Sequence, residues 1–270
     1  MWRELARRPG LDTGVERLRV HVIDWPVDLA QSACYQLVVG VGHPLRSSKA
    51  GEDAVDVWTE IDEAVGLWRE RLVPFRDNLE ANRRAPRRRV AELAEPDPKW
   101  PTDAQRLIAR LRRLLGGDVL RVDHIGSTSV PGLPAKDLID IQVVVQNLNV
   151  ADALARRSRS AGFVRVPGRW TGRDRHGTEF DEIVLVDADP GRPVNVNLRP
   201  FHDPVWGETL LFREWLRASE ANRDEYLSLK RGLIRATTRV DDYSSGKQAW
   251  IGEALERASA WAERVLWGNG

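Results

Sequence analysis

Residues 119–145 read VLRVDHIGSTSVPGLPAKDLIDIQVVV, and this stretch decides the expected fold. Residues 119–124 alternate between apolar and polar side chains, a pattern that is typical of a half-buried strand. Residues 138–145 predict a second strand, whose apolar residues fall on both faces near its end, so a central place in a sheet is expected. A turn-rich segment of small and hydroxyl-bearing residues joins the two strands.

The flanking sequence predicts helices that pack on this sheet. A capping box at residues 102–105 is expected to begin a helix that ends at Gly116. Asn149 is expected to cap a second helix that runs to Gly162. The remaining expected elements are strands at 182–186 and 194–199 and helices from residue 204 to about 267. This order predicts an α+β fold with a mixed β-sheet and packed helices, preceded by a smaller, partly helical N-terminal segment.

The N-terminal part is less regular. Residues 35–41 suit a buried strand, and apolar residues at steps of three and four predict a helix over 53–79, which Pro74 should end or kink. Five arginines within 83–89 favour a solvated linker over a nucleic-acid contact, because no aromatic residue lies among them. The expected organisation is a poorly defined segment 1–52, a helix and linker 53–95, and a main domain 96–270.

Composition excludes several classes of protein. Lys and Arg total 41 against 40 Asp and Glu, so the overall charge of a typical nucleic-acid binder is missing. No apolar run approaches the ~20 residues of a membrane span, and the first residues lack the apolar core of a signal peptide. One cysteine, Cys34, excludes an internal disulfide framework and a cysteine-based zinc site. We therefore expect a cytoplasmic protein with neither a membrane nor a nucleic acid as partner.

The segment between the first two strands could form a phosphate site. Small residues at Gly126 and beyond let backbone amides approach an anion, and Ser127, Thr128 and Ser129 add hydroxyl donors. Asp140 on the following strand could hold Mg²⁺ or Mn²⁺ that bridges those phosphates. The alternative is a tight turn whose hydroxyls bond locally, with Asp140 capping or paired. Spacing alone leaves both interpretations open.

Positive charge in the same region is carried by an uncommon residue of this chain. Only five of the 41 basic residues are lysines, and three of them are Lys136, Lys230 and Lys247. Together with Arg199 they are candidates for a cationic pocket that binds a phosphorylated ligand. His124 is a candidate for acid–base catalysis beside Asp140. The alternative for each lysine is a place on the surface, and for the histidine a structural role.

The string HIGSTSVPGLPAKDLIDIQVVV at 124–145 closely resembles the GrpB family, which its fold places in the nucleotidyltransferase superfamily. The later strings PVNVNLRP, LFREWLRAS, YLSLKR and SSGKQAW resemble the actinobacterial version of that family. That version often occurs fused behind a dephospho-coenzyme A kinase, and residues 53–93 are similar to the kinase's last helix and connector. The resemblance implies a nucleotidyltransferase-like fold for residues 96–270.

The sequence lacks residues that a dephospho-coenzyme A kinase and an active nucleotidyltransferase each need. Gly246 and Lys247 are followed by Gln248, so the Gly-rich loop G-x-x-x-x-G-K-[ST] of a dephospho-coenzyme A kinase is missing. By its own residues the chain is not expected to be that kinase. Active nucleotidyltransferases place two carboxylates after Gly-Ser and a third on a later strand. Here Asp140 matches, while Gln142, Asn195 and Asn197 stand where carboxylates are expected.

Two functions follow as expectations. The first is a GrpB-like domain that binds a nucleotide or another phosphorylated small molecule with a divalent metal, catalysis being left open because two-metal transfer needs several carboxylates. The second is a non-catalytic accessory or regulatory domain linked to coenzyme A biosynthesis, with a dephospho-coenzyme A kinase as its partner.

Overall fold

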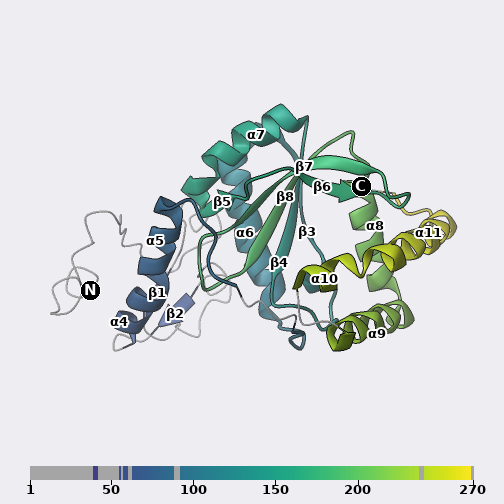
Figure 1. The fold of residues 1–270 in the computed structure, drawn as a ribbon, viewed down its shortest axis with the longest axis horizontal. Helices are drawn as coiled ribbons and strands as arrows, with labels where there is room; N and C mark the ends of the chain where they lie inside the picture. The colour runs from purple at the N-terminus through teal and green to yellow at the C-terminus, as the bar shows by residue number, and fades with distance from the viewer. Residues whose placement is uncertain are drawn as a thin grey trace.

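The structure, a computed structural model, describes residues 39–41, 55, 57–59, 63–87, 92–236 and 240–268. Predictions made for other residues, including most of segment 1–52, lie outside these ranges. A mixed sheet lies in the middle of the view in Figure 1, with α8 to α11 at its right and α4 and α5 at its left. Within the described residues, no helix combines the length and apolar character needed to cross a bilayer.

The sheet has six strands, and β4 lies inside it as predicted. The strand order is β3-β4-β8-β7-β5, and β6 pairs with β7. Strand β4 runs parallel to β8, and the other pairs are antiparallel. The bounds are β3 Val119–Ile125, β4 Ile139–Val145, β5 Phe163–Arg165, β6 Trp170–Arg173, β7 Glu179–Asp187 and β8 Val194–Pro200. The expected α+β class with a mixed sheet is confirmed.

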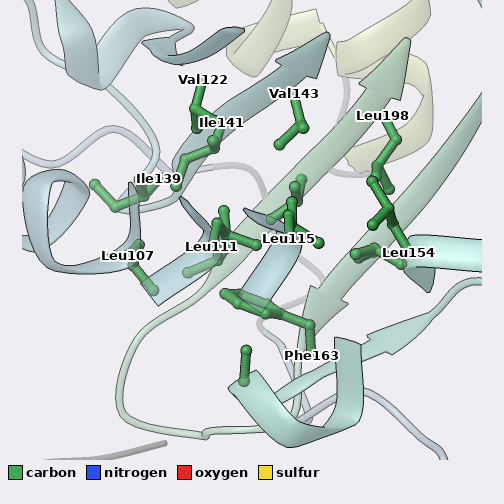
Figure 2. Close-up of a cluster of buried hydrophobic side chains, with 14 of the residues drawn as sticks. Leu107, Leu111, Leu115, Val122, Ile139, Ile141, Val143, Leu154, Phe163 and Leu198 are labelled. Carbon is green, nitrogen blue, oxygen red and sulfur yellow. The ribbon is translucent and has the colours of Figure 1, made fainter. Parts of the chain in front are cut away.

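One face of the sheet carries the main hydrophobic core. Alternate residues of β4, from Ile139 to Val145, pack with Leu198 of β8 against α6 (Lys99–Leu115) and α7 (Leu148–Arg157). Figure 2 shows Leu111 and Leu115 of α6 pointing into this cluster together with Leu154 of α7. Because side chains alternate along a strand, Asp140 faces the other side of the sheet.

The second face is contacted by α8, and the other C-terminal helices pack against α8 or α9. The C-terminal helices are α8 (Val205–Ala218), α9 (Glu220–Ala236), α10 (Val240–Ser245) and α11 (Gln248–Val265). Val130 and Leu133, in the loop between β3 and β4, pack into a cluster with Leu211, Trp215 and Tyr226 of these helices. The loop is therefore held between the sheet and α8, α9 and α11.

The N-terminal helix is shorter than expected. Strands β1 (Val39–Val41) and β2 (Val57–Thr59) pair in parallel, so the prediction of helix at 57–59 is wrong. Helix is present as α4 (Ala64–Leu67), a π-helical turn η2 (Trp68–Leu72) and α5 (Val73–Glu80). Pro74 does not end the helix, because the helical backbone continues from η2 through Pro74 into α5.

Two predicted helix starts are corrected by the structure. Helix α6 begins at Lys99 rather than at Thr102, and the Lys99 N–H donates to Asp97 Oδ1 at 2.8 Å. Helix α7 is capped by Asn147, whose side chain accepts from the Val150 N–H at 3.1 Å, and not by Asn149. The predicted end of the first helix is confirmed, because Gly116 follows α6 directly. The second helix ends earlier than predicted, at Arg157, and a 3₁₀ turn over Ser158–Ala161 continues to Gly162, whose φ is +90°.

Candidate functional site

A cavity of about 210 Å³ lies where the loop after β3, the first residues of β4 and β8, and helices α9 to α11 meet. It brings together residues from distant parts of the sequence, since the loop and α11 are more than a hundred residues apart. Its lining residues are Gly126, Ser127, Thr128, Lys136, Leu138, Asp140, Asn195, Tyr226, Tyr243 and Lys247. Nine of these ten residues are polar, ionisable or glycine, and Leu138 is the exception.

Gly126 lets the loop approach Asp140 closely. Its φ is +71°, a conformation that favours glycine, and a Cβ atom placed on it would lie 2.6 Å from Asp140 Oδ2. The preceding residue, Ile125, pairs with Asp140 in the β3–β4 register. The carboxylate is thereby held beside the start of the Ser127–Ser129 turn, and both Asp140 and Ser127 open on the same cavity.

Asp140 is half-buried and has partners that favour its charged form. Asn195, its neighbour in the β4–β8 register, donates from Nδ2 to Asp140 Oδ1 at 3.0 Å. Burial raises the pKa of Asp140, while the Asn195 hydrogen bond and the positive charges of Lys136, Lys247 and Arg87 act to lower it. The site therefore pairs a desolvated carboxyl group with several cationic groups.

Lys136 and Lys247 share one aromatic neighbour in the cavity. Their Nζ atoms lie 5.0 and 4.7 Å from the ring centre of Tyr243, which is almost fully buried. Lys247 is also the N-cap residue of α11, as expected from the sequence. Burial lowers the pKa of Lys247, and the charge of Asp140 opposes this effect. Two ammonium groups thus lie along one wall of the cavity.

Lys230 lies directly behind the cavity wall and is 1% exposed. Its Nζ donates to the Pro134 carbonyl, lies 3.5 Å from Ser127 Oγ and is 4.9 Å from the ring centre of Tyr226. Burial, and then the charges of Lys247 and Arg231, lower the pKa of Lys230 to about 7. The three lysines singled out in the sequence therefore gather around the same loop.

The loop hydroxyls divide into two groups. Ser127 lines the cavity, and its Oγ lies 3.5 Å from Lys230 Nζ. Thr128 Oγ1 donates to the Leu138 carbonyl at 3.2 Å, and Ser129 Oγ donates to the Gly126 carbonyl at 2.6 Å. The hydroxyls of Thr128 and Ser129 therefore maintain the turn, which is the local role that the sequence left open.

His124 lies outside the cavity lining. It pairs with Ile141 in the β3–β4 register, so its ring is on the face of the sheet opposite to Asp140. Its Nε2 is 3.0 Å from Thr128 Oγ1. Burial, followed by the charges of Arg217 and Arg213, lowers the pKa of His124 to about 4. The structure does not bring this histidine together with Asp140.

Arg199 also lies away from the cavity. It pairs with Val144, four residues along β4 from Asp140, which corresponds to about 13 Å of strand. Its Nε donates to Glu182 Oε2 at 2.8 Å, and its Nη1 donates to Gln142 Oε1 at 3.1 Å. Arg199 therefore belongs to a buried polar cluster within the sheet.

Two tyrosines were missed as site residues by the sequence reasoning. Tyr226 precedes Lys230 by four residues on α9, and Tyr243 precedes Lys247 by four residues. On α9 this spacing puts ring and ammonium side by side on one helix, whereas Tyr243 of α10 and Lys247 at the start of α11 meet across the turn between two helices. The repeated spacing was the signal available in the sequence.

The residues present do not form a metal site by themselves. In the part of the chain that the structure describes, no three His, Cys, Asp or Glu side chains cluster in a way that could hold a metal ion. Oδ1 of Asp140 already accepts from Asn195, and Gln142 is engaged by Arg199 and by the Trp206 carbonyl. Divalent cations need several oxygen ligands, so a metal here would have to take most of them from a bound ligand or water.

Comparison with known proteins identifies a protein family that covers the residues lining the cavity. A family model described as GrpB protein matches residues 90–257. A solved structure, the conserved protein GrpB from Enterococcus faecalis, aligns with a TM-score of 0.52 and 27% identity, over 63% of this chain and 99% of that one. The UPF0157 protein BH1888 of Halalkalibacterium halodurans is 35% identical over 171 residues, which are 62% of this chain and 82% of that protein.

A longer match is to a protein named dephospho-CoA kinase, from Mycolicibacterium paratuberculosis. It is 37% identical over 238 residues, which make up 78% of this chain and 58% of that protein. The chain thus spans little more than half the length of these kinase relatives. The aligned stretch is also longer than the region 90–257 that the family model matches.

Proposed function

This chain belongs to the GrpB family, and we propose that its cavity binds the phosphate of a nucleotide or of another phosphorylated small molecule. The observation that carries the proposal is the gathering of Lys136, Lys230 and Lys247 around Ser127 and Asp140. These are three of the five lysines in the whole chain. Lys136 and Lys247 line the cavity, and Lys230 touches Ser127, which lines it.

An anion would compensate the charges that the fold places here. Burial lowers the pKa of Lys230 and of Lys247, which means that their charged forms are poorly solvated. A phosphate group with nearly two negative charges would restore those interactions, and Asp140 alone offsets one of the positive charges. The hydroxyl of Ser127 and the backbone at Gly126 offer hydrogen-bond donors of the kind that phosphates take.

The cavity is proposed to bind the ligand and not to catalyse phosphoryl transfer, because the groups that two-metal phosphoryl transfer needs are not all present. Asp140 has Asn195 beside it where a second carboxylate would serve. A Mg²⁺ or Mn²⁺ ion would be held by Asp140 together with the phosphate oxygens of the ligand. The positive charge near the phosphates would then come mainly from lysines.

The proposal is tested by thermal unfolding of the protein with ATP, CTP, GTP, coenzyme A and dephospho-coenzyme A, each with and without Mg²⁺ or Mn²⁺. A ligand present at 100 times its Kd should add about 2.7 kcal/mol to the free energy of unfolding. We expect at least one phosphorylated compound to raise the unfolding temperature, and its unphosphorylated counterpart to have no effect. If none of the compounds shifts the transition, the proposal is wrong.

A second candidate function rests on the match to the kinase relatives. Because that match extends beyond the GrpB region, we also propose an accessory role beside a dephospho-coenzyme A kinase. Co-purification of this chain with the separately expressed kinase tests it. We expect a complex on gel filtration and a change in kinase activity, and two separate peaks with unchanged activity would contradict it.

A further inference from the structure

We infer that Arg87, in the connector before the main domain, is a positioning residue of the cavity that orients Asp140 through Asn195. Its use in ligand binding rests on the function proposed above, whereas the positioning itself can be measured without a ligand. The family match begins at residue 90, so Arg87 lies outside the region that the GrpB model describes. The sequence alone favoured a solvated linker at this point.

The geometry forms a chain of three side chains. Arg87 Nη1 donates to Asn195 Oδ1 at 2.9 Å, and Asn195 Nδ2 donates to Asp140 Oδ1 at 3.0 Å. A guanidinium group can only donate, so the amide oxygen of Asn195 must face Arg87. The amide NH₂ group is then turned toward Asp140. Arg87 therefore decides which end of the Asn195 amide the carboxylate meets.

Arg87 is itself held firmly by the sheet. Its Nη2 forms an ion pair with the buried Asp187 and donates to the Val194 carbonyl at 2.6 Å. The same Asp187 accepts from the Val194 N–H at 2.8 Å through Oδ1, and its backbone carbonyl accepts from the Ala85 N–H at 3.0 Å. The connector is thus pinned between β7 and β8, next to the residues that carry Asn195.

The helix before the connector is docked on the residues that directly follow β7. Arg71 of η2 forms a two-point ion pair with Asp189, at 2.8 and 2.7 Å, and Asn78 of α5 donates to the Ala188 carbonyl at 2.9 Å. A shift of this helix against β7 would therefore act on Arg87 and, through Asn195, on the cavity. This arrangement makes the connector part of the site.

The pKa of Asp140 depends on the charged and titratable groups that surround it. They come from every element packed against it: Lys136 before β4, Lys247 at α11, Arg87 of the connector, Tyr226 of α9 and Tyr243 of α10. Loss of Arg87 removes one positive charge and frees the Asn195 amide to turn. Both changes disfavour the ionised carboxylate, so the pKa of Asp140 should rise.

The experiment is a pH titration of the Asp140 side-chain carboxyl carbon by NMR in the full chain, with Asp140→Asn used to assign the signal. Arg87→Ala is expected to shift the midpoint upward and to speed exchange of the Asn195 side-chain amide protons. Arg87→Lys keeps the charge but cannot bridge the same acceptors, so it should speed the exchange and shift the midpoint less. The exposed Arg84 of the same linker supplies the control Arg84→Ala, which should change neither quantity.

Arg87→Ala leaves the buried Asp187 without its ion-pair partner and can fail to fold. The double variant Arg87→Met with Asp187→Asn removes both charges and keeps the test possible. If a folded variant without Arg87 shows the wild-type midpoint and the wild-type amide exchange, the inference is wrong. If the wild type binds no phosphorylated ligand, the proposed function fails, while this titration still decides the role of Arg87.

Discussion

Oδ2 of Asp140 occupies the space in which a side chain on Gly126 would begin, 2.6 Å from its ideal Cβ position. The loop can pass this close to the carboxylate only because residue 126 has no side chain. Gly132, later in the same loop, also has a positive φ, of +75°, but nothing lies within 4 Å of its Cβ position. The two glycines therefore form a matched pair for experiment.

Gly126→Ala should destabilise the protein more than Gly132→Ala. Both variants strain a backbone with positive φ, but only the first forces Asp140 to move, which we expect to cost about 1–3 kcal/mol more. It should also weaken binding of a phosphorylated ligand by at least about tenfold. Urea denaturation and calorimetry measure the two effects. Equal stability and equal affinity of the two variants would contradict the account of the turn.

Lys230 should make stability depend on pH in the alkaline range. Its pKa is lowered to about 7 in the folded protein, so between pH 7 and its normal pKa near 10.5 the unfolded chain binds more protons. The free energy of unfolding should therefore rise with pH, by up to about 1.4 kcal/mol per unit from this group. Lys230→Met should flatten that slope, and the exposed Lys99→Met should not. Urea denaturation at pH 7.5, 8.5 and 9.5 would refute the prediction if the Lys230 variant kept the wild-type slope.

His124 should affect acid stability and leave ligand binding unchanged. With a folded pKa of about 4 and an unfolded value near 6.5, the unfolded state binds more protons as the pH falls through this range. The wild type should lose stability below pH 6.5, and His124→Gln should lose less. The ligand affinity of the variant at pH 7.5 should stay within about twofold of wild type. A large loss of affinity would show instead that His124 takes part in ligand binding.

Arg199 should matter for folding and not for the ligand. Its buried pair with Glu182 means that Arg199→Met leaves an uncompensated carboxylate, at a cost of about 3–5 kcal/mol. The double variant Arg199→Met with Glu182→Gln should recover much of this loss. Urea denaturation measures both. A stable Arg199→Met protein that no longer binds the ligand would show instead that Arg199 contacts it.

Much of the sheet could be predicted, because long apolar or alternating runs specify β3, β4, β7 and β8. Strands β5 and β6 escaped prediction because they are three and four residues long and contain Arg or Gly. They are formed by pairing with β7, which is a tertiary effect. The start of α6 was missed for a similar reason: Trp100 is buried and its Nε1 donates to Asp137, which stabilises an extra turn before Thr102.

The lysines of the candidate site could be predicted from the sequence. Lysine is rare in this chain, and that rarity pointed to Lys136, Lys230 and Lys247. Strand register decides which alternate residues share a face, and only the structure shows that His124 faces away from Asp140. Arg87 was hidden among neighbouring arginines, since nothing in the sequence shows that its side chain meets Asn195.

The most direct test of the central claim is calorimetric titration of the ligand that most stabilises the wild type. Wild type should be compared with the double variant Lys136→Gln and Lys247→Gln, and with Lys99→Gln as the surface control. Each charge-assisted contact to a phosphate contributes about 1.5–3 kcal/mol, so the double variant should bind at least about 100-fold more weakly while the control binds like wild type. Equal affinity of all three proteins would contradict the claim that this lysine-lined cavity holds the phosphate.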